Sequence, residues 1–252
     1  MPVRLPTSPW SYTPPRERIF QPVAEGVAPM ASGILFVCYA NMCRSPMAEY
    51  IARDMLTRRL GADRAPVPVS SAGTNAMPGY RMHPHAATVA AGLGADPAPF
   101  RSRPLTADTI AQAGLVLAAT QRERAVCLSL VPAALHRTFT LRQFSRLAAA
   151  AGDQSASSGP DDARPDAGRD GVPDAARDRG QDAARDVGQD AARRLAAAVA
   201  AAVRARGQLQ PVEPGDDDLA DPVGQPVAAF HQCAGQIEAA LEPVVALIAS
   251  CG

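Results

Sequence analysis

The fold class of this chain is decided by residues 34–49, ILFVCYANMCRSPMAE. The segment opens with four apolar residues, which predict a short buried strand. From Ser45 it has the pattern of an amphipathic helix, with Pro46 in the first turn, where proline is favoured. The loop between strand and helix would face unpaired backbone N–H groups at the positive end of the helix dipole. The stretch therefore predicts a strand–loop–helix unit that can bind an anion.

The same alternation of strand and helix continues along the chain, which favours a parallel sheet with helices on its faces. We expect an α/β fold, with a single three-layer domain in which four parallel strands are flanked by helices. The strands are predicted at 34–37, 67–74, 114–120 and 137–141. The helices are predicted at 45–60, 83–93, 122–131, 142–151, 193–207 and 227–248.

Composition excludes several classes of protein. The chain has 252 residues and zero net charge, and all 25 basic residues are arginine. This balance gives no electrostatic reason to expect nucleic acid or a membrane surface as a partner. There is no run of 18 apolar residues and the N-terminus lacks the apolar core of a secretory signal. Five cysteines are an odd number and too scattered for a disulfide scaffold, so we expect reduced thiols and a cytoplasmic protein.

Two segments are predicted to be disordered. Residues 1–31 are Pro-rich and aperiodic, and Met30 is a second candidate start of translation. Residues 152–190 contain almost nothing to bury, and an eight-residue repeat covers 165–196. We expect a disordered octapeptide-repeat insert, with a partner-binding segment as the alternative. The ordered domain would then consist of 32–151 and 191–252.

The loop at the end of the first strand carries the reactive chemistry. A helix N-terminus lowers the pKa of a nearby thiol, so we expect Cys38 to be a thiolate. Arg44 can bind two phosphate oxygens with its planar guanidinium, and the Ser45 hydroxyl can hydrogen-bond to the thiolate. A nucleophile at the centre of an anion site predicts phosphoryl transfer to cysteine.

Two other interpretations of the cysteines are weaker. Zinc binding by Cys38 and Cys43 needs two more ligands, for which His83 and His85 are the only candidate pair. A buried structural pair of cysteines does not account for the adjacent Arg-Ser-Pro. We therefore expect neither a metal nor a cofactor.

CYANMCRSPMAE at 38–49 resembles the signature loop of the low-molecular-weight protein tyrosine phosphatase family. The resemblance extends through SSAGT at 70–74 and RSRPLT at 101–106 to an Asp-Pro pair before the last helix. It covers roughly 34–147 and 191–249, with the repeat insert between them. It implies a cysteine-dependent phosphatase that acts on phosphotyrosine in proteins or on small phosphate monoesters.

The resemblance also implies the roles of individual residues. Cys38 would be the nucleophile, and Arg44 would bind the phosphoryl oxygens. Asp221 would protonate the leaving oxygen and later take a proton from water. A second Asp-Pro pair at Asp96 lies too early in the chain, and we predict a turn there.

Further loop residues have supporting roles by the same resemblance. Asn41 would hold the loop with a positive φ, and Ser45 would tune the thiolate. Ser71 would support the loop from the neighbouring strand, and Cys43 would form a reversible disulfide with Cys38 that protects it from oxidation. The remaining loop residues are Tyr39, Ala40 and Met42.

Three positions depart from the family pattern. Ala40 replaces a usual glycine, Phe100 replaces a supporting histidine, and Val223 replaces an aromatic residue that helps flank a phenyl ring. Tyr39 could supply part of that ring contact. These differences leave the phosphate chemistry intact and bear on the substrate.

Two other functions are alternatives. An arsenate reductase on the same scaffold would use Cys38 with further redox thiols, although no cysteine pair on a loop is evident. An inactive phosphate-binding adaptor, in which the repeat insert recruits a partner, is permitted by the three departures. Cys127 and Cys233 are predicted core residues, and Cys251 lies near the terminus. Surface or capping roles are expected for His83, His85, His136 and His231.

Overall fold

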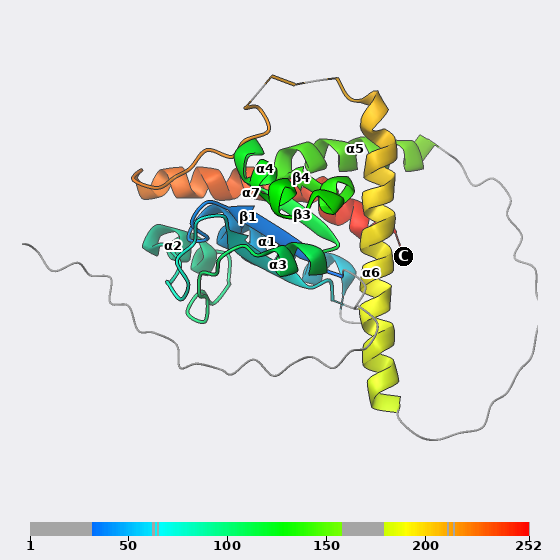
Figure 1. Cartoon of the computed structure of the whole chain (residues 1–252), viewed down its shortest axis with the longest axis horizontal. Coiled ribbons are helices and arrows are strands. Elements are labelled where there is room, and N and C mark those ends of the chain that lie inside the picture. The colour runs from blue at the N-terminus through cyan, green and yellow to red at the C-terminus, as the bar shows by residue number, and fades with distance from the viewer. Residues whose placement is uncertain are drawn as a thin grey trace, which may run out of the picture.

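The computed structural model of the chain describes residues 32–61, 64, 66–157, 179–210, 212–213 and 215–251. Four parallel strands form one sheet in the order β2-β1-β3-β4, which confirms the predicted sheet (Figure 1). The strands are β1 (Ile34–Cys38), β2 (Val69–Gly73), β3 (Leu115–Ala118) and β4 (Thr138–Thr140).

Helices cover both faces of this sheet and complete the three layers. One face carries α1 (Arg44–Leu60), α2 (Pro84–Gly92), α5 (Leu141–Ser157) and α7 (Val227–Ser250), and α6 (Arg179–Ala205) packs on α5 and α7. The opposite face carries α3 (Ala107–Gln112) and α4 (Gln121–Leu130). Two short 3₁₀ helices are η1 (Pro132–Arg137) and η2 (Arg206–Gln208).

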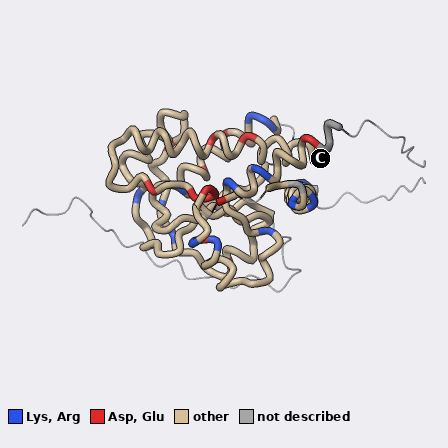
Figure 2. Tube along the Cα trace, turned by 90° about the horizontal axis from the view of Figure 1, so that it is seen from above, with Lys and Arg blue, Asp and Glu red and all other residues tan. Residues whose placement is uncertain are grey.

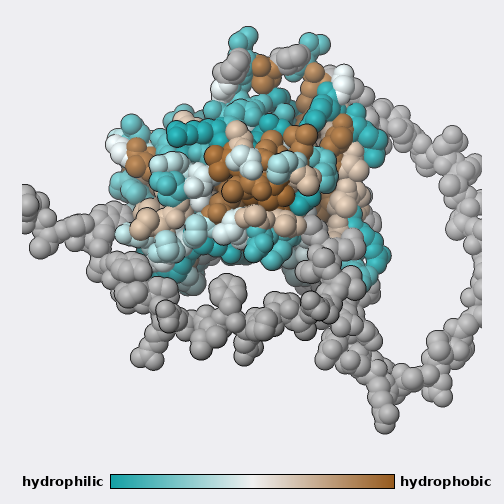
Figure 3. Space-filling model, in the orientation of Figure 1, coloured by the Kyte–Doolittle hydropathy of each residue, from teal (hydrophilic) through white to brown (hydrophobic). Residues whose placement is uncertain are grey.

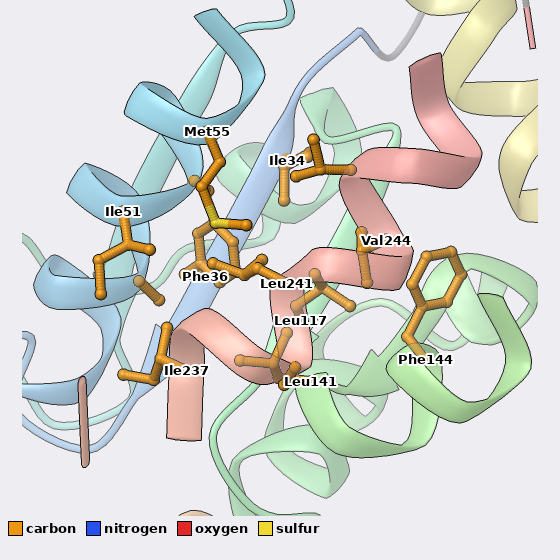
Figure 4. Close-up of a cluster of buried hydrophobic side chains, with 14 of the residues drawn as sticks. Ile34, Phe36, Ile51, Met55, Leu117, Leu141, Phe144, Ile237, Leu241 and Val244 are labelled. Atoms are coloured by element: carbon orange, nitrogen blue, oxygen red, sulfur yellow. The ribbon is translucent and has the colours of Figure 1, made fainter. Parts of the chain in front are cut away.

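The alternating side chains of β1 divide between two hydrophobic cores, as the pleat of a strand requires. Ile34 and Phe36 belong to the larger core, which is shared with α1, α5 and α7. Figure 4 shows Phe36 among side chains of α1 and α7 such as Met55 and Leu241. Leu35 and Val37 point into the smaller core under α3 and α4. Because both faces of β1 are buried, its sequence is a continuous apolar run.

Two features differ from the predictions. The short helix α3 was not expected, although Thr106 caps it by exchanging hydrogen bonds with Thr109. The predicted insert boundaries also differ from the helix ends, because α5 continues to Ser157 and α6 begins at Arg179. Alanine-rich repeat units favour helix, which explains the extension of α6. Residues 1–31 and 158–178 lie outside the described part, so their predicted disorder stays a prediction.

The surface carries both signs of charge. Figure 2 shows basic and acidic positions interspersed along the trace. In Figure 3, apolar side chains gather over α4 and η1, where Leu130 and Leu135 are exposed. By length and composition, α7 could cross a membrane, but its apolar residues form much of the larger core. A core helix of a globular protein meets the same criterion.

The strand order places a crevice at the carboxyl end of the sheet. From β1, the chain crosses to β2 on one side, whereas β3 and β4 lie on the other side. Ligands of open parallel sheets bind at such a switch point. The loop after β1 lies there, so the topology places residues 39–43 where a ligand would bind.

Candidate active site

The loop at residues 39–43 connects β1 to α1 and is tied to the chain that follows β2. Thr74 N donates to Cys38 O at 2.9 Å, and Asn75 N donates to Tyr39 O at 2.8 Å. On the far side of the loop, His83 N donates to Met42 O at 2.9 Å. These backbone hydrogen bonds bring the loop close to residues 73–75 and to the start of α2.

Gly73 allows this close approach. A Cβ at this position would lie 2.7 Å from Asn41 N, 2.7 Å from Tyr39 O and 2.9 Å from Ala40 C. All three atoms are backbone, so none can rotate away as a side chain would. Because Gly73 of SSAGT has no Cβ, the end of β2 can lie directly against the loop and support it.

Asn41 holds the loop from inside. Its φ of 53° is the positive value expected, and it is the one non-glycine residue with positive φ in the described part. The side chain is fully buried and bonded at both ends. Nδ2 donates to Ser45 Oγ at 3.0 Å and to Ser71 Oγ at 2.8 Å, while Oδ1 accepts from Arg103 N at 2.9 Å. Because the amide is satisfied at both ends, Phe100 in place of a histidine leaves no unpaired group on Asn41.

The thiol of Cys38 is the centre of this arrangement. Cys38 ends β1 and is 2% exposed, and its Sγ lies 2.9 Å from Ser45 Oγ. Ser45 is held in turn by Asn41, so its hydroxyl is positioned toward the sulfur. Such a hydroxyl can hydrogen-bond to a thiolate and stabilise its charge.

A carboxylate on α1 extends the network outward. Ser71 Oγ donates to Glu49 Oε2 at 2.7 Å, and Arg53 Nη2 donates to Glu49 Oε1 at 2.5 Å. Glu49 lies four residues after Ser45, so both side chains are on one face of α1. The loop is therefore linked through hydrogen bonds to the surface of the helix.

Arg44 and Asp221 meet at the pocket. Arg44 is buried, and its Nη2 donates to Asp221 Oδ2 at 2.6 Å while its Nη1 donates to Leu219 O at 3.1 Å. The Asp221 side chain is 45% exposed, and its Oδ1 accepts from Val223 N at 3.1 Å. The structure thus places Cys38, Arg44 and Asp221 at one pocket.

The loop before α7 is docked on the carboxyl end of the sheet. Leu219 N donates to Ala119 O at 2.9 Å, and Gln121 N donates to Asp218 Oδ1 at 2.8 Å. Buried Asp217 forms an ion pair with Arg146 of α5. These contacts position Asp221 even though α5 and α7 are separated in sequence by the insert.

The pocket above the loop has a volume of about 290 Å³. Its lining contains Ala40, Met42 and Val223 in addition to the reactive residues, and it includes His83. Tyr39, which was considered as part of the ring contact, does not belong to this lining. Its hydroxyl accepts from Asn75 Nδ2 at 2.8 Å, and Arg122 lies over its ring.

Cys43, Cys127 and Cys233 are buried free thiols, whereas Cys251 is half-buried. Burial, with the nearby Cys38 and Asp221, raises the pKa of Cys43 far above its usual range. Burial also raises the pKa of Cys127 to about 12 and that of Cys233 to about 11, in agreement with their predicted core positions. A thiolate is the nucleophilic form, so Cys43 is poorly activated in this state.

Sequence reasoning missed three residues of the site. Glu49 could have been found, because its spacing from Ser45 puts both on one helix face. Arg103 donates its backbone N–H to Asn41 Oδ1 and its Nε–H to Ser71 O. No pattern of side chains in the sequence indicates either contact. His83 was expected to have a surface or capping role. It does cap α2, since Nδ1 accepts from His85 N at 3.3 Å, and it also lines the pocket.

Comparison with known proteins gives one family. Residues 33–154 match the family described as low molecular weight phosphotyrosine protein phosphatase. A probable low molecular weight protein-tyrosine-phosphatase, EpsP, of Ralstonia nicotianae is 33% identical over 117 residues, or 46% of this chain and 75% of the relative. A protein-arginine-phosphatase of Geobacillus stearothermophilus is 38% identical over 111 residues, or 44% of this chain and 70% of the relative.

Solved structures show the same fold. The YwlE arginine phosphatase from Geobacillus stearothermophilus gives a TM-score of 0.51 at 24% identity, covering 85% of this chain and 91% of its own. Vibrio vulnificus Wzb in complex with benzylphosphonate gives 0.51 at 18% identity, covering 85% and 97%.

Proposed function

Because the chain belongs to the low molecular weight phosphotyrosine protein phosphatase family, we propose that it hydrolyses phosphotyrosine in proteins with Cys38, Arg44 and Asp221. The protein is a cysteine-dependent phosphatase, and its named relatives favour this over an arsenate reductase or an inactive adaptor. The observation that carries the proposal is that three residues from separate parts of the chain meet at one pocket. The three residues come from the end of β1, the start of α1 and the loop before α7, and they line one pocket.

In the first proposed step, Cys38 Sγ attacks phosphorus in line with the ester oxygen. The S–P bond forms as the P–O bond breaks, and Asp221 gives its proton to the departing phenolate. Arg44 and the N–H groups at the start of α1 stabilise the negative charge on the phosphoryl oxygens. The products of this step are a phenol, a phosphocysteine and an Asp221 carboxylate.

In the second step, Asp221 takes a proton from water while the water oxygen attacks phosphorus. The S–P bond breaks, which releases inorganic phosphate and returns Cys38 as a thiolate. The Ser45 hydroxyl, 2.9 Å from the sulfur, supports that thiolate as the leaving group. Asp221 ends the cycle protonated, ready for the next substrate.

The contact between Arg44 and Asp221 bears on substrate entry. A phosphate dianion competes with the Asp221 carboxylate for the same guanidinium. Binding therefore releases Asp221 toward the pocket mouth, where its side chain is already 45% exposed. The released carboxylate then takes up a proton from solvent and serves as the acid while phosphate occupies the loop.

The direct test is hydrolysis of p-nitrophenyl phosphate at mildly acidic pH with a metal chelator present. We expect turnover by the native chain and none by Cys38→Ser, because serine lacks an activated thiolate. Cys251→Ser is the matched control and should retain activity, since Cys251 is near the C-terminus. Sustained hydrolysis by Cys38→Ser would refute the assigned nucleophile.

The substrate class needs a separate comparison, because the relatives include tyrosine and arginine phosphatases. We expect a higher kcat/KM for a phosphotyrosine peptide than for phosphoarginine or phosphoserine peptides of matched sequence. Faster cleavage of phosphoarginine would move the substrate to that class and leave the cysteine mechanism unchanged.

The proposal extends to the organisation of the chain. We propose that 32–151 and 191–252 form one phosphatase domain and that the repeat segment at 152–190 is an insert in it, for which partner binding is the alternative role. The cysteines of the described part are all free, which supports a reducing compartment such as the cytoplasm. Fractionation of cells with an antibody to the native protein tests this location.

A further inference from the structure

His83 is an aromatic side chain in a pocket that otherwise has small or aliphatic walls. It lines the pocket together with Cys38, Arg44, Asp221 and Val223. Its position in the chain follows the segment after β2, so it approaches the phosphate loop from the side of α2. The position after Asp221-Pro222 holds Val223, which offers an aliphatic contact only.

Three contacts hold His83 in place. The backbone N of His83 donates to Met42 O of the loop at 2.9 Å, which couples His83 to the phosphate site. Its Nδ1 accepts from His85 N at 3.3 Å as the cap of α2. Its ring stacks on Phe230 of α7, with centroids 4.8 Å apart and planes at 15°. Phe230 itself is fully buried, so the stack has a fixed base.

These contacts favour the neutral imidazole. Because Nδ1 accepts a hydrogen bond, the proton of the neutral ring is on Nε2. A positive charge at the N-terminus of α2 would oppose the helix dipole. Burial and the neighbouring His85 lower the pKa of His83, although Asp221 acts in the opposite direction. The ring therefore presents a flat, uncharged surface beside the phosphate site.

We infer that His83 is a specificity-determining residue that stacks on the aromatic ring of an aryl phosphate bound with its phosphoryl group at Cys38 and Arg44. The inference rests on the proposed function and names the residue that would recognise the phenyl group. Aromatic pairs prefer offset-stacked or edge-to-face contact, and the Phe230–His83 stack extends such a surface to the pocket. Neither Tyr39 nor Val223 supplies this contact.

The test compares two ligands that are not hydrolysed, benzylphosphonate and inorganic phosphate. Both occupy the phosphate loop, but only the first has a ring. Dissociation constants are measured by calorimetry on the full chain, so the readout does not depend on turnover. Because His83 also caps α2, two variants separate the roles. His83→Asn keeps a capping acceptor without the ring, and His83→Phe keeps a ring without the acceptor.

We expect His83→Asn to weaken benzylphosphonate binding by about 2- to 12-fold and to leave phosphate binding nearly unchanged. His83→Phe should bind benzylphosphonate close to the native level. His136→Ala, an exposed histidine on η1, is the matched control and should behave as the native chain.

Equal weakening of both ligands in His83→Asn would assign His83 to the loop structure and overturn the inference. Native benzylphosphonate binding by that variant, or failure of His83→Phe to restore it, would overturn it as well. Failure of the proposed function is a distinguishable result. The native chain would then hydrolyse no phosphate ester, while His83→Asn would still weaken benzylphosphonate binding more than phosphate binding.

Discussion

Gly73→Ala is the substitution whose effect follows most directly from the geometry. The added Cβ would lie 2.7 Å from Asn41 N and from Tyr39 O, both of which are backbone atoms of the phosphate loop. Contacts of ordinary length begin near 3.4 Å, so the loop or β2 has to move by several tenths of an ångström. The movement falls on the segment between Cys38 and Arg44.

The two consequences have different magnitudes. Insertion of a methyl group into a packed site costs about 1–3 kcal/mol of unfolding free energy, or roughly 2–12 °C in Tm. Displacement of a reacting group can reduce catalysis by up to about 100-fold per ångström. We therefore expect Gly73→Ala to fold and to lose about 10- to 100-fold in kcat/KM.

The assay pairs thermal unfolding with p-nitrophenyl phosphate kinetics and phosphate inhibition. Gly235→Ala is the matched control, because this glycine is exposed within α7 and its Cβ would meet no atom within 4 Å. That control should be neutral or stabilising by up to about 1 kcal/mol. Native kcat/KM and native phosphate inhibition in Gly73→Ala would show that the close approach is not needed for the loop.

Three further predictions concern the proposed acid Asp221, the ion pair of Asp217 in the loop before α7, and His83 at the pocket wall. Asp221→Asn should lower kcat by about 10²–10⁴ while phosphate inhibition stays at least as strong as native, because no carboxylate then competes for Arg44, and an unchanged kcat for phenyl phosphate would exclude Asp221 as the acid. Asp217→Ala leaves Arg146 without its partner and should cost about 1–3 kcal/mol by urea unfolding and lower kcat, whereas exposed Asp216→Ala should do neither. Because the pKa of His83 is lowered from 6.5, the native state binds this proton less readily than the unfolded chain, and stability is lost as the pH falls below 6.5. His83→Phe should therefore lose less Tm than the native chain between about pH 7 and pH 5, and equal losses would contradict this.

Much of the fold could be predicted from local patterns. The apolar runs that become β1 and β3 are buried on both faces, so they stand out as continuous hydrophobic segments. Long amphipathic helices such as α1 and α7 have enough periodicity to be recognised. The six-residue α3 has too few turns to show a period, and the helix ends at Ser157 and Arg179 lie in stretches whose sequence contains almost nothing to bury.

The candidate site divides in the same way. Cys38, Arg44 and Ser45 lie close together in sequence, and Asp221 is the first residue of an Asp-Pro pair before the last helix, so a motif can identify them. Arg103 contributes a backbone N–H to Asn41, and a backbone donor leaves no signature in side-chain identity. Tyr39 was considered as part of the ring contact because it lies inside the loop, but it is not among the residues that line the pocket, whereas His83 is.

The sequence by itself determined the reactive chemistry, because one loop between a strand and a helix contains the thiol, the guanidinium and the hydroxyl within a few residues. Only the tertiary structure decided what surrounds that loop. Asp221 reaches Arg44 because Leu219 and Asp218 dock on the end of the sheet, and His83 reaches the pocket because α2 packs beside α1 and α7. The physical reason is that local motifs are set by chain connectivity, whereas the walls of a pocket are formed by side chains that packing brings together from distant segments.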